Sequence, residues 1–183
     1  MQTAVLMSTV TRALPLSAAG TGYLIEIVKS EQVLNLKRGN HTLQSFKIAY
    51  GKGDRAPKRK RGDNRTPIGN YQVLDFKSDS KFHYFMQINY PNMIDAWHGY
   101  KDRLISPAEY KQIAISFKNQ EMPPQDTALG GYIGIHGLGE ITDDKIKIHA
   151  ALNWTEGCIA LTNDEINILR KYVTKGTPVL IRE

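Results

Sequence analysis

The chain has very little cysteine and no long run of apolar residues. Cys158 is the only cysteine among 183 residues, so the chain can form no internal disulfide and cannot supply the cysteine pairs of a zinc finger or an iron–sulfur site. No apolar stretch approaches the roughly 20 residues of a membrane-spanning helix. What remains is an ordinary globular composition with 41% hydrophobic residues. At roughly 100–200 residues per domain, this length predicts a single domain.

The first 20 residues lack most features of a secretory signal. They have no basic stretch at the start, and Arg12 interrupts the apolar residues, although Ser17-Ala18-Ala19 resembles a cleavage site. We interpret residues 1–21 as an N-terminal extension or the remnant of a weak signal, with the folded domain covering residues 22–183.

Positive charge is concentrated in one segment. Residues 52–65 contain seven basic and two acidic side chains, whereas the whole chain has a net charge of +6. A run of this kind, with Gly and Pro and no apolar period, predicts a solvated, mobile loop. A nucleic-acid contact is disfavoured because no aromatic residue is interleaved with the basic ones. A generic loop and a contact to an anionic polymer both remain open.

Alternating apolar residues predict β-strands through the first half of the chain. The expected strands cover residues 23–30, 33–36, 46–50, 71–76, 81–89 and 178–181. The first three follow one another closely, with turn residues at Arg38-Gly39-Asn40, and therefore predict a β-meander.

Two helices are marked by capping boxes, in which a Ser or Thr and a Glu three residues later satisfy each other's free N–H groups. Ser106 and Glu109 begin a helix expected to reach about Phe117, and Thr162 and Glu165 begin one expected to reach about residue 175. Strands with few helices predict a mostly β fold with small helices.

The final third of the chain contains a candidate nucleophile and base. Cys158 follows Gly157 and precedes the second capped helix, and His136 ends a short apolar strand 22 residues upstream. A thiol needs a base to raise its thiolate fraction at neutral pH, and backbone N–H groups in the Cys158 turn could stabilise an oxyanion. The order of His before Cys argues against papain-like peptidases. A buried structural cysteine and a structural histidine are the alternative interpretation.

These residues resemble a known family. His136-Gly137 followed by Thr155-Glu156-Gly157-Cys158 is similar to the catalytic motif of the L,D-transpeptidases (YkuD-type). Residues 23–30 resemble the first strand of that family, residues 66–71 its Thr-Pro-x-Gly-x-aromatic segment and residues 176–179 its closing strand, and Tyr90-Pro91-Asn92 resembles a subgroup. The resemblance covers about residues 22–183.

The resemblance implies a β-sandwich-like mixed sheet in which His136 and Cys158 meet at one end. It also implies acyl transfer on peptidoglycan stem peptides, a role in cell-wall biogenesis and cell shape, and a periplasmic or cell-envelope location. The Cys158 thiolate would attack the diamino acid carbonyl at stem position three, D-Ala would leave, and a thioester would remain. This chemistry needs neither metal nor nucleotide. Residues 52–65 would then face an anionic wall polymer.

Further residues are candidates for the site. Gly157, Thr155 and Gly137 are expected to form an oxyanion site or to position substrate, and the expected substrate cleft includes Glu156, His149, Trp97 and Tyr100. Several have alternatives: a turn role for Thr155, the role of base for His149, and buried packing for the 97–100 stretch, which is otherwise expected to be a cleft loop. Asn163 is either a cleft residue or a helix-start residue.

The sequence departs from the family pattern at three places near the motif. Glu156 stands where the family often has His, Ala160 where it often has Arg or Asn, and the interval between His136 and Cys158 is longer than usual. These neighbours line the family's cleft, so the acceptor stays open. The alternatives are an L,D-carboxypeptidase or amide hydrolase on the same scaffold, and a catalytically silent module that binds the cell wall.

Overall fold

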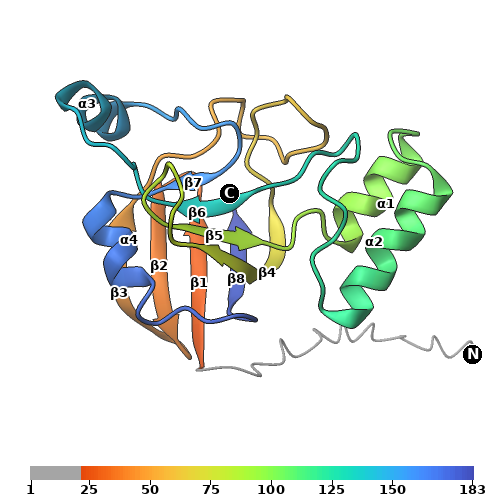
Figure 1. Cartoon of the computed structure of the whole chain (residues 1–183), viewed down its shortest axis with the longest axis horizontal. Coiled ribbons are helices and arrows are strands. Elements are labelled where there is room, and N and C mark those ends of the chain that lie inside the picture. The colour runs from red at the N-terminus through yellow and green to blue at the C-terminus, as the bar shows by residue number, and fades with distance from the viewer. Residues whose placement is uncertain (1–21) are drawn as a thin grey trace, which may run out of the picture.

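The computed structural model describes residues 22–183, and the expected N-terminal extension, residues 1–21, lies outside this range. Within it, eight strands form one mixed sheet in the order β3-β2-β1-β8-β4-β5-β6-β7, flanked by four short helices (Figure 1). The strands are β1 (Tyr23–Val28), β2 (Val33–Arg38), β3 (His41–Lys47), β4 (Gly69–Lys77), β5 (Phe85–Ile88), β6 (Gly134–His136), β7 (Ile159–Ala160) and β8 (Pro178–Arg182). The predicted fold class, mostly β with small helices, is confirmed.

The expected meander is confirmed by the pairing of the first three strands. β1 pairs antiparallel with β2, and β2 with β3. β3 covers His41–Lys47, whereas the expected strand covered 46–50, so the strand both begins and ends earlier than expected. Most of its side chains are exposed and only Phe46 is buried. Apolar alternation cannot reveal such an edge strand.

The strand expected over residues 81–89 is wrong in its first half. Only β5, Phe85–Ile88, is a strand, and all four of its residues are buried. Before it the chain turns: the His83 N–H donates to the Ser80 carbonyl at 2.8 Å, and His83 has a φ of 73°. The turn places Phe82 against His136, with ring centroids 4.2 Å apart.

The sheet curls until its two edges meet. An isolated antiparallel bridge joins Ala49, just after the edge strand β3, to Ala160 of the opposite edge strand β7. One core cluster therefore includes residues from both halves of the sheet, among them Ile25 of β1 and Ile135 of β6, both fully buried. This curling holds the short strands β6 and β7 in place.

The helices are α1 (Met93–Lys101), α2 (Pro107–Asn119), α3 (Asp143–Ala151) and α4 (Asn163–Leu169). Both predicted capping boxes are present, at the start of α2 and of α4, but α4 ends at Leu169 and not near residue 175. Figure 1 shows α1 and α2 together on one side of the sheet and α3 on the other. No helix among residues 22–183 combines the length and apolar character needed to cross a bilayer.

Candidate active site

Two short parallel strands bring His136 and Cys158 to one groove. β6 and β7 pair in parallel with Ile135 opposite Ile159 and His136 opposite Ala160, and the Leu161 N–H donates to the His136 carbonyl at 2.9 Å. His136 is thus the last residue of β6, and Cys158 directly precedes β7. Both line a groove of about 740 Å³.

The Cys158 thiol is half-buried and protonated at neutral pH. Its Sγ–H donates to the Tyr132 carbonyl at 3.5 Å. Burial raises the pKa of Cys158 to about 11, although a backbone hydrogen bond from Gly134 and the charge of Lys58 act in the opposite direction. The resting thiol therefore needs a base before it can act as a nucleophile.

His136 is buried and neutral, with one nitrogen committed to the backbone. Its Nδ1 lies 2.7 Å from the Gly137 carbonyl oxygen. Because a carbonyl only accepts, this contact assigns the proton to Nδ1 and leaves the lone pair on Nε2. Burial lowers the pKa of His136 to about 4. A neutral imidazole with a free Nε2 lone pair is the form that can take a proton from a thiol.

Aromatic rings fix the plane of the His136 imidazole. Phe82 stacks on it with a centroid separation of 4.2 Å, and Trp154 packs edge-on with a separation of 6.0 Å. Neither contact was expected from the sequence, since Phe82 lies in a turn 54 residues upstream. The rings contribute to the burial of the imidazole, and burial is the main cause of its lowered pKa.

The turn before Cys158 is held by two threonine hydroxyls. Thr155 Oγ1 donates to the Cys158 carbonyl at 2.6 Å and accepts the Gly157 N–H at 3.2 Å, and the Thr66 hydroxyl donates to the Gly157 carbonyl at 2.9 Å. The geometry supports the turn role of Thr155. The sequence does not predict Thr66 in the site, although Thr66 belongs to the Thr-Pro segment that resembles the family.

Two glycines of the motif are required by close packing. Gly157 has a φ of 129°, and a Cβ there would lie 2.7 Å from the Arg65 carbonyl oxygen; a Cβ at Gly137 would lie 2.7 Å from Asn163 Oδ1. Asn163 in turn accepts the N–H groups of Leu138 and Gly139 at 2.8 and 3.1 Å. Asn163 thus begins α4 and fixes the loop after His136, and it does not line the groove.

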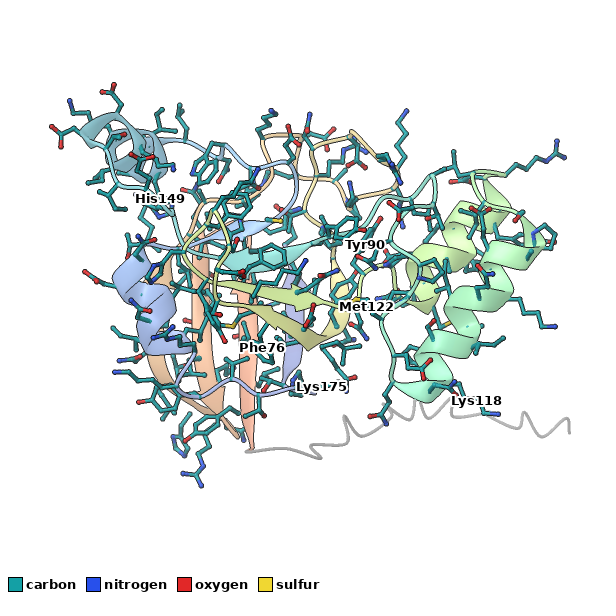
Figure 2. All side chains as sticks on the ribbon, in the orientation of Figure 1. Phe76, Tyr90, Lys118, Met122, His149 and Lys175 are labelled. Carbon is teal, nitrogen blue, oxygen red and sulfur yellow. The ribbon has the colours of Figure 1, made fainter. Side chains whose placement is uncertain are left out.

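Only part of the expected substrate cleft lies at the groove. Glu156 lines it and forms an exposed ion pair with Lys52 at 3.6 Å. His149 lies on α3, is buried and does not line the groove; its Nδ1 accepts the Trp154 indole N–H at 3.4 Å. Figure 2 shows it on α3, at the edge of the molecule.

The placement of Trp97 and Tyr100 corrects both sequence-based alternatives. The 97–100 stretch is part of helix α1 and is not a cleft loop. The two side chains do not line the groove, and with exposed fractions of 48% and 46% they are not buried packing residues either. The helix was missed because its cap pairs Asn92 with Asp95, and not Ser or Thr with Glu.

The basic loop is less solvated than expected. Asp63 accepts hydrogen bonds from Lys58 Nζ at 2.8 Å and from the backbone N–H groups of Arg59, Lys60 and Arg65. The Lys58 and Asp63 side chains are only 4% and 5% exposed. The loop therefore folds around a buried ion pair, which a charge pattern alone does not reveal.

The groove carries an excess of positive charge. The charged residues that line it are Lys52, Lys58, Arg61, Lys77, Lys81, Asp126 and Glu156. Among residues 22–183, no group of three His, Cys, Asp or Glu side chains is placed to hold a metal ion. The arrangement is that of a thiol and a neutral imidazole in a cationic groove.

Comparison with known proteins places this chain in a family. The profile of the L,D-transpeptidase catalytic domain (YkuD) matches residues 22–181. The chain belongs to the L,D-transpeptidase family. It is 29% identical over 161 residues to a protein of Escherichia coli K12 named "Putative L,D-transpeptidase YafK", a match that covers 85% of this chain and 48% of that protein.

Solved structures share the L,D-transpeptidase fold. The helical cell shape determining protein Pgp2 of Campylobacter jejuni superposes with a TM-score of 0.56 at 21% identity, covering 88% of this chain and 47% of Pgp2. Bd1075 of Bdellovibrio bacteriovorus gives a TM-score of 0.53 at 20% identity, covering 88% of this chain and 48% of Bd1075. The chain spans about half the length of these relatives.

The departures from the L,D-transpeptidase motif have clear positions in the structure. The long interval after His136 contains α3. Ala160 is fully buried in β7, bridged to Ala49, and does not line the groove. Of the three departures, only Glu156 reaches the groove, where it faces Lys52.

Proposed function

We propose that this L,D-transpeptidase-family chain performs cysteine-dependent acyl transfer on peptidoglycan stem peptides. The observation that carries the proposal is that Cys158 and His136 line one groove, the first as a half-buried thiol and the second as a neutral base oriented by the Gly137 carbonyl. Both residues also belong to the part of the sequence that resembles the family's catalytic motif.

The proposed reaction begins with proton transfer from Cys158 Sγ to His136 Nε2. The sulfur attacks the carbonyl of the diamino acid at stem position three and forms a carbon–sulfur bond. The amide bond to D-Ala then breaks, and the His136 imidazolium returns its proton to the leaving amine. An amine of a second stem attacks the thioester, forms the new amide and regenerates the thiol.

Water in place of the amine would make the same site an L,D-carboxypeptidase or amide hydrolase, since both routes share the thioester. The name of the relative Pgp2, a helical cell shape determining protein, supports a role in cell-wall biogenesis and cell shape. Such a substrate places the protein in the periplasm or cell envelope.

The test is to incubate the purified protein with a disaccharide-tetrapeptide and to identify the products by mass spectrometry. Crosslinked dimers that have lost D-Ala establish transpeptidation. Tripeptide alone establishes hydrolysis, and no product from the wild type favours a silent wall-binding module. The Cys158→Ala variant is the control for a contaminating activity.

A further inference from the structure

The groove cations are of two kinds. Lys52, Arg61, Lys77 and Lys81 are exposed, so water and salt screen their charges and weaken any ion pair that they form. Lys58 differs from them, because it is 3% exposed and held in place. A fixed, desolvated cation can impose geometry on a bound anion, whereas an exposed one mainly attracts it.

Several contacts hold Lys58 at the groove. Its ammonium donates to the Lys60 carbonyl at 3.0 Å and to Asp63 at 2.8 Å, and it lies 6.0 Å from the centre of the Tyr90 ring, which Figure 2 labels between the sheet and the α1–α2 pair. Gly130, also in the groove wall, lies beside the stem of Lys58: a Cβ at this glycine would be 3.6 Å from Lys58 Cε.

Asp63 only partly neutralises this ammonium. The carboxylate shares its charge among Lys58 and three backbone N–H groups, while an ammonium has three N–H donors. Two of these have partners among residues 22–183. Burial raises the pKa of the Cys158 thiol, and the positive charge of Lys58 opposes that effect, so its field reaches the reacting sulfur.

We propose that Lys58 is the specificity-determining residue of the groove and that its third N–H binds a carboxylate of the substrate. The inference rests on the proposed function for the identity of the peptide. Among the carboxylates of a tetrapeptide stem, two belong to the residues on either side of the bond that is cleaved: the terminal one of D-Ala, and the side-chain one of the diamino acid. Asp63 is the positioning residue that holds the ammonium in place.

The test measures binding, so that it does not depend on turnover. In the Cys158→Ala background, calorimetry compares a free tetrapeptide stem with two analogues, one amidated at the terminal carboxylate and one at the diamino acid carboxylate. We expect one analogue to bind about 10–100-fold more weakly than the free peptide, as for a hydrogen bond to a charged group. The analogue affected identifies the carboxylate.

Removal of Lys58 should abolish that preference. Because Lys58→Met alone would leave Asp63 buried without its cation, the variant is Lys58→Met with Asp63→Asn, and its melting temperature is recorded. It should bind the free peptide as weakly as the affected amide. Asp63→Asn alone keeps the ammonium and offers an amide oxygen to hold it, so the preference should persist. Lys77→Met should weaken all three peptides by the same small factor, about twofold.

Three outcomes overturn the assignment: a preference that survives in the Lys58 variant, a loss of binding that is equal for all three peptides, or no binding of any peptide to Cys158→Ala. The proposed function fails separately, if the wild type turns over no stem peptide. A Lys58-dependent preference without turnover would refute the proposed reaction and support the carboxylate site. Turnover without that preference would support the reaction and refute the carboxylate site.

Discussion

The Nδ1 nitrogen of His136 lies 2.7 Å from the carbonyl oxygen of Gly137, the next residue in the chain. This contact makes the backbone the partner that orients the imidazole, so no carboxylate is needed to fix the tautomer. It also requires the chain to turn sharply after β6, and Asn163 holds that turn through the N–H groups of Leu138 and Gly139. The start of α4 therefore supports the proposed base.

Replacement of Cys158 by Ala should abolish acylation and turnover and leave the fold intact. The side chain is half-buried and the sulfur bonds only to backbone groups, the Tyr132 carbonyl at 3.5 Å and the Gly134 N–H, so its loss leaves only a small cavity. Mass spectrometry of the protein after incubation with substrate detects the thioester adduct, and circular dichroism checks the fold. Turnover by the variant would refute the nucleophile assignment.

Replacement of His136 by Ala should slow acylation by roughly 10²–10⁴-fold, the usual contribution of a positioned acid–base group, with little effect on peptide binding. His149→Ala is the matched control, since His149 is also buried but lies outside the groove. Pre-steady-state acylation rates compare the two. If only the His149 variant were slow, Cys158 would remain the nucleophile but His149 would be its base. If both variants acylated at the wild-type rate, neither histidine would be the base and the proposed mechanism would be refuted.

The reactivity of the thiol should keep rising with pH. Burial raises the pKa of Cys158 to about 11 and lowers that of His136 to about 4, so both groups are neutral between these values. Alkylation of this single thiol by iodoacetamide should therefore rise about tenfold per pH unit between pH 7 and 10, in proportion to the thiolate fraction. A rate that is already constant above about pH 6 would instead indicate a thiolate–imidazolium pair.

The sequence predicts best those features that local chemistry determines. The capping boxes of α2 and α4 are local, and both helices begin where expected. α3 was missed because its cap, Thr142, has Lys145 where a box has Glu, and because Ile146 and Ile148 are exposed, which leaves no buried apolar stripe. The apolar alternation of β1 is likewise local. In the exposed edge strand β3, the sequence pattern predicts only the last residues.

The candidate site also combines residues that the sequence predicts with contacts that it does not. Cys158 and His136 are predicted from their local context and from the family resemblance, and their catalytic roles stay predictions. Phe82 stacks on His136 only because a turn before β5 folds back. Lys58 is buried in a loop that folds around Asp63, whose carboxylate accepts hydrogen bonds from Lys58 and from backbone N–H groups. Contacts of this kind depend on the assembled fold and have no signature in a window of sequence.

Gly157→Ala should destabilise the protein and displace the thiol. The added Cβ would lie 2.7 Å from the Arg65 carbonyl oxygen at a φ of 129°, which we expect to cost about 2–4 kcal/mol. Gly62→Ala is the control, because Gly62 also has a positive φ, 77°, but has no atom within 4 Å of its Cβ position; it should lose about 1 kcal/mol. Urea unfolding measures both, and equal losses would contradict the clash.

The stability of the protein should depend on His136 between pH 4 and 6.5. Burial lowers the pKa of His136 to about 4 in the folded state, against about 6.5 in an unfolded chain. Between these values the unfolded state binds a proton that the folded state does not, so the free energy of unfolding falls as the pH falls. The full effect, below pH 4, is about 3 kcal/mol.

Other buried groups titrate in the same range, so the comparison must be between variants. Burial also lowers the pKa of His149, which adds to the acid loss, whereas burial raises the pKa of Asp95 to about 6 and opposes it. His136→Gln removes one titration and leaves these two. Its free energy of unfolding, from urea titrations at pH 4, 5, 6 and 7, should fall less steeply with acid than that of the wild type, whatever its value at pH 7. Parallel curves for the two proteins would mean that burial does not lower the pKa of His136 below its unfolded value, and the assignment of a desolvated imidazole would be wrong.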